Sequence, residues 1–497
     1  MSLNSQILTI TEPSIGIEPM KMPNLGEREG GGGNYSGFQG GVTPYVRVNG
    51  FTFQEGSIIK LNLNSTSRYP ELNIQLLDNQ DNFTVDRFPR DGDILSLRIE
   101  IDKSSTYKDI RMDFTILEFR GVPTSTFEKS RGEAMFNVRA VAKLPGLYTD
   151  HVTAYPENTS FEHIKSVASE LQLGLASNVI ETNDRMTRVC AQQSKLEFLS
   201  NTIAHSYVSD DAFQTYCIDP YYYINFVDLQ KVFNGDDQID TTDMLTTQMW
   251  DERDGDPTVG RGEEQAQFIL TNHHLREGTK TYISSFNLVN NSTKIALENG
   301  YRRSMQYFDV NTDEDQNLYE FDIESLVSDN IGDREEALKG RRNYENDEYE
   351  SHVKHKYMGI QSESTHENYK YAYINNVQNL VELDKMNLVV NLTGIHPAIT
   401  RYMKVPVYIY NYSSTNTETT KEINKQAREG DFETKNEELG NKTDLDNGDS
   451  PVIFTIDEFL TSHYVVMGIE YKFNETDGFN QVLHLSRREW PARLNNV

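Results

Sequence analysis

The sequence predicts a mainly β fold with an α+β domain: two related antiparallel β-barrels, an intervening α/β domain and loop insertions. Three observations support this prediction. Apolar and polar residues alternate over short segments between residues 44 and 147, and the alternation returns after residue 386. A period of two predicts strands with one buried face. Between these regions, two helix-start signals precede apolar stripes of helical spacing, which predicts the α/β domain.

The first predicted barrel covers 44–147. Its clearest alternating segments are ILSLRIEI at 94–101, IRMDFTILEF at 110–119 and MFNVRAV at 135–141. The turn sequence PRDGD at 89–93 comes before the first of them. Several short alternating strands with turns between them are typical of an antiparallel barrel or sandwich.

The predicted α/β domain covers 148–262. Thr159 with Glu162, and Ser194 with Glu197, have the spacing of capping boxes at helix starts. The two expected apolar stripes are Phe161, Ile164, Val167, Ala168 and Leu171, then Leu196, Leu199, Ile203 and Tyr207. We expect Gly174 to stop the first helix. Residues 216–226 predict two strands joined by a turn at Pro220.

The second predicted barrel is discontinuous and consists of 263–310 with 386–410 and 451–492. Its strands include VPVYIY at 405–410, YVVMGIEYKF at 464–473 and a closing strand at 482–485. In each half of the chain, three alternating strands are separated by turns or polar stretches. This weak internal repeat favours two copies of one barrel type.

The remaining segments are predicted to lie outside the barrels. Residues 1–43 are rich in glycine and form an arm, whose segment Ile7 to Ile10 either adds a strand to a neighbour or belongs to a flexible tail. Residues 311–385 form a charged insertion with a helix expected near 333–341. Residues 411–450 form a polar loop insertion with few apolar residues.

Composition excludes several classes of protein. The formal net charge is -29, from 76 acidic and 47 basic residues, which argues against nucleic-acid binding by a basic face. The excess is either a solvated surface or a lining past which a polyanion slides. The two cysteines, Cys190 and Cys217, are too few for a disulfide framework and are expected to be reduced. The absence of a signal peptide and of a long apolar run predicts assembly in a cytoplasm without membrane insertion.

The sequence supports a catalytic or ligand-binding role less well than a structural role. Cys190 or Cys217 with His205 is a conceivable nucleophile pair, and His273-His274 or His352 with His355 are conceivable metal ligands. The Gly30–Gly33 run lacks the lysine and the strand–helix context of a phosphate loop. Paired carboxylates for glycan cleavage stay open because acidic residues are so many. We therefore expect no catalytic, cofactor-binding or metal residues and no cofactor.

The order of several segments resembles the baseplate hub proteins of contractile phage tails, the hub half of VgrG proteins and the phage tail D proteins. CAQQSKLEFL at 190–199 resembles the family's Q-x-S-x-x-x-F-L helix start, and IDPYY at 218–222 stands where the family has a hairpin. TSHYVVMGI at 461–469 resembles the family's L-S-G-x-Y-x-V-x-x-V, although Ser462-His463 replaces Ser-Gly. LSRREW at 485–490 is similar to the closing L-x-R. The resemblance covers most of 44–492.

The resemblance implies a structural, non-enzymatic subunit of the virion's tail baseplate. It implies a homotrimer whose two barrels per chain give six similar positions, joining a sixfold tail tube to a threefold central spike. The implied partners are a separate spike protein, a tail tube or tube-initiator protein and baseplate wedge proteins, with DNA only as cargo passing through an axial channel during genome ejection. An acidic channel lining that repels phosphate fits the composition. The alternatives are a tail-associated peptidoglycan hydrolase with its site in 311–450 and a receptor-binding tail protein.

Overall fold

A computed structural model describes most of the regular elements of the chain. The described residues are 7–16, 43–53, 57–78, 92–100, 109–123, 134–235, 270–272, 283–291, 302–309, 318–323, 354–361, 365–384, 386–395, 399–412, 454–457 and 459–487. Strands dominate this part of the chain, so the predicted mainly β fold is confirmed.

One large sheet organises the molecule. Its N-terminal strands are β2 (Thr43–Val48), β3 (Phe51–Phe53), β4 (Ile58–Ser65), β5 (Glu71–Asp78), β6 (Ile94–Glu100), β7 (Ile110–Pro123) and β8 (Ala134–Ala142). Its C-terminal strands are β14 (Leu270–Thr271), β15 (Ile283–Asn290), β19 (Met386–Thr393), β20 (Lys404–Tyr408), β23 (Ser462–Asn474) and β24 (Gly478–Ser486). Their order is β15-β19-β24-β23-β4-β5-β8-β7-β6-β2-β3, and β20 also pairs with β23.

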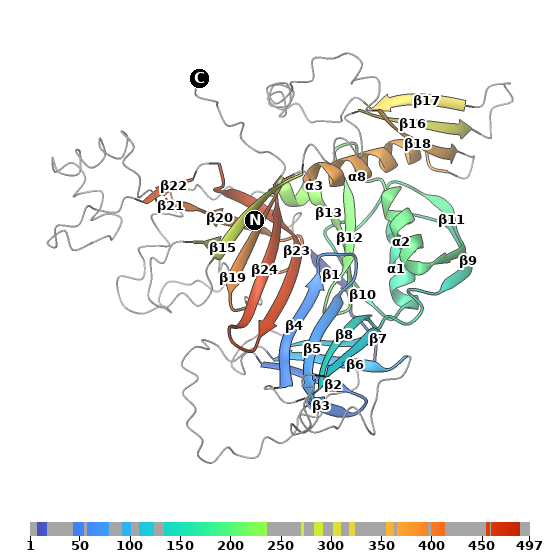
Figure 1. Ribbon diagram of the computed structural model, residues 1–497. Coiled ribbons are helices and arrows are strands. Elements are labelled where there is room, and N and C mark those ends of the chain that lie inside the picture. Colours follow the sequence, from blue (N-terminus) through green and yellow to red (C-terminus); the bar gives the residue numbers. More distant parts are fainter. Residues whose placement is uncertain are drawn as a thin grey trace, which may run out of the picture.

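The two halves of the sheet join edge to edge through β23 and β4. Residues Ile469 to Asn474 of β23 pair antiparallel with Ser65 to Lys60 of β4. Figure 1 shows β19, β24 and β23 beside β4 and β5, while β2, β3 and β6 cross beneath β4 and β5 at a steep angle. Among the described strands no pairing closes either half into a ring, so the predicted barrels are seen as curved parts of one sheet.

Both halves repeat one strand order. In chain order the first half uses β4, β5, β7 and β8, and the second uses β15, β19, β23 and β24. In space the orders are β4-β5-β8-β7 and β15-β19-β24-β23, so the third and fourth strands exchange places in each. The early part of β7 pairs with β6, as the early part of β23 pairs with β20. We call these four-strand sets the first and second modules.

Irregularities in register fall at matching places in the two modules. The β7–β8 register shifts between Ile116 and Glu118, and the β23–β24 register shifts between Val466 and Gly468. The two modules can be superimposed by matching these two bulges. Following the strand pairings from there makes Ile58 of β4 equivalent to Ile283 of β15. The β4–β5 and β15–β19 registers both shift immediately after those two isoleucines. Because bulges change the local twist of a strand, matching bulges give both modules a similar curvature.

The α/β part contains a second sheet, in the order β1-β10-β13-β12. Its strands are β1 (Leu8–Thr11), β10 (Gly174–Ser177), β12 (Gln214–Ile218) and β13 (Tyr223–Asp228). Two further strands, β9 (Asp150–Asn158) and β11 (Met186–Ser194), pair with each other, and α3 (Leu229–Phe233) follows β13. The predicted strand pair at 216–226 is confirmed, because β12 pairs antiparallel with β13.

Both predicted helix starts are confirmed. Thr159 caps α1 (Ser160–Glu170), and Ser194 caps α2 (Lys195–Ala204) with a complete capping box to Glu197. The prediction that Gly174 stops the first helix is wrong, since α1 ends at Glu170 and Gly174 begins β10. A Cβ at Gly174 would lie 2.5 Å from the Tyr223 ring and 2.9 Å from the Thr11 carbonyl oxygen. The glycine therefore allows β1, β10 and β13 to pack closely.

The N-terminal strand lies within the protein's own sheet. β1 pairs antiparallel with β10, and Leu175 N donates to Thr11 Oγ1 at 3.1 Å. The backbone amides of Ser14 and Ile15 both donate to the Gln172 carbonyl. Strand formation at Ile7 to Ile10 is thus confirmed, but its partner here is the same chain.

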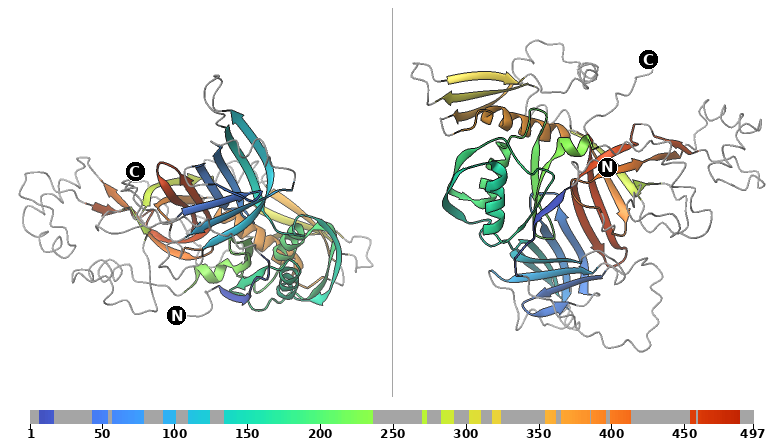
Figure 2. Two further views of the ribbon diagram at one scale, coloured as in Figure 1. Left: turned by 90° about the horizontal axis from the view of Figure 1, so that it is seen from below. Right: turned by 180° about the vertical axis from the view of Figure 1, so that it is seen from behind.

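A helix and a small sheet interrupt the second module. α8 (Tyr369–Leu383) follows a three-stranded sheet of β17 (Leu318–Ile323), β16 (Arg302–Asp309) and β18 (Lys354–Gln361). β16 lies within the 263–310 segment assigned to the second barrel, but it pairs with β17 and β18 instead. The helix expected at 333–341 lies outside the described residues, and α8 was not predicted. In the views of Figures 1 and 2, α8 lies across one end of the β12–β13 pair.

Two further strands, β21 (Tyr410–Tyr412) and β22 (Phe454–Ile456), pair with each other beside the second module. They flank the predicted 411–450 insertion, most of which lies outside the described residues. Over the part of the chain that the structure describes, no helix has the length and apolar character to cross a membrane. The domain borders predicted from the sequence otherwise remain predictions.

The turn between β4 and β5 connects three parts of the molecule. The Arg401 guanidinium donates to the carbonyl oxygens of Ser67 and of Thr66, the latter at 3.2 Å. Ile218 N of β12 donates to the Arg68 carbonyl at 2.7 Å. The Arg68 side chain reaches Ser200 Oγ of α2 at 2.7 Å. This turn therefore fixes the first module against the second module and against the α/β part.

Gly468 makes that junction possible, and its replacement is expected to destabilise the fold. A Cβ at this position would lie 2.9 Å from Thr66 Cγ2 and 3.0 Å from Thr66 Cα. Gly468→Ala forces the β4–β5 turn away from β23, at a cost of about 1–3 kcal/mol, the usual range for overpacking. Urea unfolding of the two proteins measures this difference. Gly16→Ala is the control, because nothing lies within 4 Å of a Cβ there, and an equal loss in both variants would contradict the prediction.

Candidate functional site

Eight strands of the large sheet form a wall whose two side edges have no full partner among the described strands. The strands β15-β19-β24-β23-β4-β5-β8-β7 form an eight-strand wall with alternating directions. β15 ends the wall at one side. At the other side, β6 pairs with β7 from Ile110 to Thr115, and within the described ranges the later half of β7 has no partner strand on that side. Unpaired edges of this length are sites of strand addition.

Exposed apolar side chains accompany both edges. Phe286 of β15 is 37% exposed, and Leu117 at the β7 bulge is 57% exposed. In the repeat alignment Phe286 occupies the position of Leu61, which is only 2% exposed and pairs with Phe473 of β23. The β15 edge therefore exposes an apolar side chain at a position that is buried in the first module.

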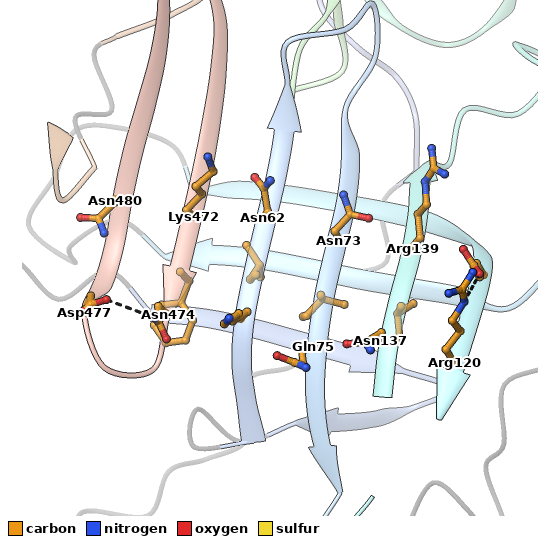
Figure 3. A pocket seen from close by; sticks show the side chains of 16 residues that line it. Asn62, Asn73, Gln75, Arg120, Asn137, Arg139, Lys472, Asn474, Asp477 and Asn480 are labelled. Carbon is orange, nitrogen blue, oxygen red and sulfur yellow. Dashed lines mark hydrogen bonds and ion pairs between the residues drawn. The ribbon is translucent and has the colours of Figure 1, made fainter. Parts of the chain in front are cut away.

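A polar groove crosses the wall at the junction of the two modules. Its cavity volume is about 680 Å³. Figure 3 shows Asn480, Lys472, Asn62, Asn73 and Arg139 side by side on neighbouring strands. The cross-strand register places them directly opposite one another in a row that continues to Glu118. A second row contains Asn474, Lys60, Gln75, Asn137 and Arg120.

Amides and charged residues predominate in this groove, and its other lining residues are the apolar Leu61, Ile74, Val138 and Phe473. Six of its residues are amides, namely Asn62, Asn73, Gln75, Asn137, Asn474 and Asn480. Arg120 pairs with Glu118, Arg139 lies 3.6 Å from Glu71, and Lys472 lies 3.0 Å from Glu470. A surface of this kind is strongly hydrated without a large net charge.

Glu470, beside the groove, is a carboxylate bound by two basic side chains. Its Oε1 accepts from His484 Nε2 at 2.8 Å, and its Oε2 lies 3.0 Å from Lys472 Nζ. The hydrogen bond from His484, with Lys472 and Asn62 beside it, lowers the pKa of Glu470 to about 2. The carboxylate therefore stays charged and neutralises Lys472 over the whole physiological range.

The sequence-based hypothesis of an acidic lining does not describe this groove. Four basic residues line it, Lys60, Arg120, Arg139 and Lys472, against the two acidic residues Glu118 and Asp477. Glu71 and Glu470, beside the groove, bring the charges close to balance. The acidic excess of the chain therefore lies elsewhere, because these strands alternate apolar residues with amides rather than with carboxylates.

The cysteines considered as nucleophiles are buried, and burial raises the pKa of both thiols. Cys190 Sγ donates to the Gln193 carbonyl at 3.4 Å and lies in β11. His205 ends α2, where burial lowers its pKa to about 4, and its ring stacks on Tyr369. These settings keep the thiols protonated and the imidazole neutral, which is unlike an activated Cys–His pair.

Other sequence candidates fall largely outside the described residues. These are Gly30–Gly33, His273, His274 and His352, while His355 lies in β18. Within the described ranges, no group of three or more His, Cys, Asp or Glu side chains is arranged to hold a metal ion. The expectation of no catalytic, cofactor or metal residues remains a prediction.

The groove residues were missed in the sequence, although a signal is present. LNLN at 61–64 and LNIQ at 72–75 place an amide at every second position of adjacent strands. Alternation of apolar residues identified the buried face of each strand. It did not draw attention to the amides on the opposite face. The pairing of β23 with β4 had no local signal, because Asn62 and Glu470 are 408 residues apart.

No protein-family profile matches the chain, and no curated protein matches it in sequence. Several solved structures align with most of the chain at low identity. The 43 kDa tail protein of prophage MuSo2 from Shewanella oneidensis aligns with 9% identity and a TM-score of 0.47, over 90% of this chain and 99% of its own. The tail protein from Neisseria meningitidis MC58 aligns with 9% identity and a TM-score of 0.43, over 90% and 96%.

A chain of the Francisella PdpA–VgrG complex aligns with 11% identity and a TM-score of 0.39, over 91% of this chain and 59% of that one. The structural neighbours are phage tail proteins and VgrG proteins. They belong to the classes that the sequence resemblance named.

Proposed function

We propose that the chain is a structural, non-enzymatic baseplate hub subunit of a contractile tail, and that three copies close into a ring around an axial channel. One observation carries the proposal: β23 pairs with β4 inside the chain, and β7 of one copy can pair in the same way with β15 of the next. β23 and β7 occupy equivalent positions in the two modules, and so do β4 and β15.

Strand direction is compatible with head-to-tail closure. The wall has an even number of strands, and every neighbouring pair in it is antiparallel. A β7 edge therefore meets the next β15 edge in antiparallel orientation, and the alternation continues around the ring. Closure removes both free edges, which are otherwise an aggregation hazard.

Size favours three copies over two. At a strand spacing of about 4.8 Å, three eight-strand walls form a cylinder about 37 Å across at the backbone, and two form one about 24 Å across. Strand tilt widens both, and inward side chains narrow both. Three copies leave room for a DNA duplex and repeat the module six times, which fits a sixfold tube above and a threefold spike below.

The polar groove faces the channel in this arrangement. Its balanced charges give passing phosphate little to bind, because each cation with a paired carboxylate releases few counterions. Hydrated amides then make a lining of low affinity for DNA. In this proposal the separate spike, the tail tube or its initiator, and the wedge proteins contact the rims of the ring.

A designed disulfide tests the ring. Aligning the bulges places Arg120 where Glu470 lies, and Val289 where its partner Asn64 lies. Arg120→Cys with Val289→Cys is therefore expected to cross-link neighbouring copies, since directly opposed residues in a sheet lie within disulfide range. Non-reducing gels should show species up to a closed trimer. Arg120→Cys with Asn287→Cys is the shifted control, and equal cross-linking of both pairs would reject the register.

The low DNA affinity of the groove is a second testable expectation. Asn73→Lys, Gln75→Lys and Asn137→Lys together add uncompensated cations on the two neighbouring strands β5 and β8. Duplex binding should strengthen, with a salt slope steeper by about 0.9 per new phosphate contact. Fluorescence anisotropy across a salt series measures this slope. Tight, steeply salt-dependent binding by the unchanged protein would contradict the proposed lining.

A zymogram on peptidoglycan separates this proposal from the hydrolase alternative. The purified protein is expected to leave no clearing, and clearing that maps to residues 311–450 would favour the enzyme.

A further inference from the structure

The joint between α8 and the α/β part depends on two asparagines. Asn376 Nδ2 donates to the carbonyls of Ile203, Ala204 and Ser206 at 3.0–3.1 Å, and its Oδ1 accepts from Gln214 N at 3.0 Å. Asn375 Nδ2 donates to the Ala212 carbonyl at 2.7 Å. The last carbonyls of a helix have no partner within it, so α8 completes the end of α2 from outside.

Histidines from both sides meet in this joint. The His205 ring stacks on Tyr369 and Tyr373 of α8, with ring centroids 4.0 and 4.7 Å apart. His366, just before α8, donates from Nε2 to the His205 carbonyl at 3.0 Å. Its buried Nδ1 has no hydrogen-bond partner among the described residues. A proton added to that nitrogen would therefore find no acceptor in the docked structure.

Buried charges of both signs are already present in the joint. Arg188 of β11 is buried, and its Nη2 donates to Ser160 Oγ at 2.8 Å. The nearest carboxylate, Asp184, is buried and already accepts from Ser160 N, Thr182 Oγ1 and Tyr207 N. Burial lowers the pKa of His366. Asp184 and the hydrogen bond to the His205 carbonyl oppose this change, and Arg188 adds to it by a smaller amount.

The other titratable groups at the joint offer no acceptor for a proton added to His366 Nδ1. His163 of α1 has its pKa lowered by burial and by Arg188, so it stays neutral beside the guanidinium. Asp210 accepts from the Tyr207 hydroxyl at 2.7 Å, and Glu367 is exposed at the surface. Tyr369 and Tyr373 have raised pKa values from burial and remain neutral.

We propose that α8 is an acid-released clamp. At neutral pH it is docked on α2 and β12, and it contacts the β16–β18 sheet. When His205 and His366 become protonated beside Arg188, α8 undocks together with that sheet. The inference concerns a single chain and does not depend on the ring.

The way in which α8 docking depends on pH follows from the number of protons that the docked and released forms bind. Burial lowers the pKa of docked His205 to about 4, from the ordinary value near 6.5. The released form therefore binds more protons between these values, so docking is complete above about pH 6.5 and weakens as pH falls toward 4. His205 alone shifts the docking equilibrium by about 30-fold between pH 7.5 and pH 5. His366 adds to this shift.

Amide hydrogen exchange of the full chain, corrected for intrinsic rates, tests the clamp. Peptides from α8 should lose protection by at least about 30-fold between pH 7.5 and pH 5. Peptides from β4 and β5 should keep theirs. In the double variant His205→Phe with His366→Gln, which retains a ring and a side-chain donor, α8 should respond little to pH. His484→Gln, a histidine on the sheet face, should leave the α8 response unchanged.

Three outcomes would overturn the clamp. They are equal α8 protection at both pH values, equal loss in α8 and in β4, or an undiminished pH response in the double variant. The ring is judged separately by the disulfide test at neutral pH, so failure of one proposal is distinct from failure of the other.

Discussion

Phe286→Lys is expected to convert the proposed trimer into monomers at micromolar concentration. Phe286 lies on the β15 edge at the position equivalent to Leu61, which is buried and pairs with Phe473 of β23 at the internal junction. In the ring the next copy's β7 would bury the lysine in the same way. An unpaired buried ammonium costs several kcal/mol, and the cost recurs at all three joints. Light scattering coupled to size-exclusion chromatography measures the mass.

The matched control is Val152→Lys. Val152 is 79% exposed on β9, which lies outside the eight-strand wall, so this lysine should leave the trimer intact. Circular dichroism should show the same strand content in both variants. A Phe286→Lys protein that remains a trimer, or an unchanged protein that is monomeric at high concentration, would remove the support for the ring.

Asn376→Asp should undock α8 even at pH 7.5. The substitution replaces a donor to three carbonyls with a carboxylate oxygen, so like partial charges face each other. The Ala204 and Ser206 carbonyls lose this donor, whereas the Ile203 carbonyl keeps the Ser206 amide and hydroxyl. Each buried polar group left without a partner costs about 1–3 kcal/mol. We therefore expect protection of α8 amides to fall by at least about 100-fold at neutral pH.

Asn379→Asp provides the comparison on the same helix. Asn379 Nδ2 donates to the Asn375 carbonyl at 2.9 Å within α8, so its loss does not touch α2. Its effect on α8 exchange should be several-fold smaller. Equal effects of the two variants would mean that helix propensity, rather than the contacts of Asn376, holds α8 in place.

Local patterns in the sequence were sufficient for the individual elements. Alternation identified the strands of both modules, and the capping residues Thr159 and Ser194 located two helix starts. α8 escaped notice because the buried polar residues Asn375 and Asn376 interrupt its buried apolar positions Ala372, Ile374 and Leu383. Gly174 was misread because glycine serves both as a helix stop and where strands pack closely.

The arrangement of the modules was only partly predictable. An internal repeat was visible as similar strand triplets, but the shared spatial order and the matching bulges required coordinates. The junction at Gly468 depends on a contact with Thr66, almost the length of the chain away. No window of neighbouring residues contains that information. The same is true of the β15 edge, whose significance comes from its equivalence to β4.

The union of β4 with β23 has a consequence for the growing polypeptide. The two partners Asn62 and Glu470 are separated by 408 residues. At translation speeds of about 5–20 residues per second, β4 leaves the ribosome roughly 20–80 s before the segment that will cover its side. During this interval the nascent N-terminal half presents a bare strand to every other nascent copy on the same message. Premature pairing between such copies would trap them, so slow synthesis or a holding chaperone should strongly influence the yield of correctly folded protein.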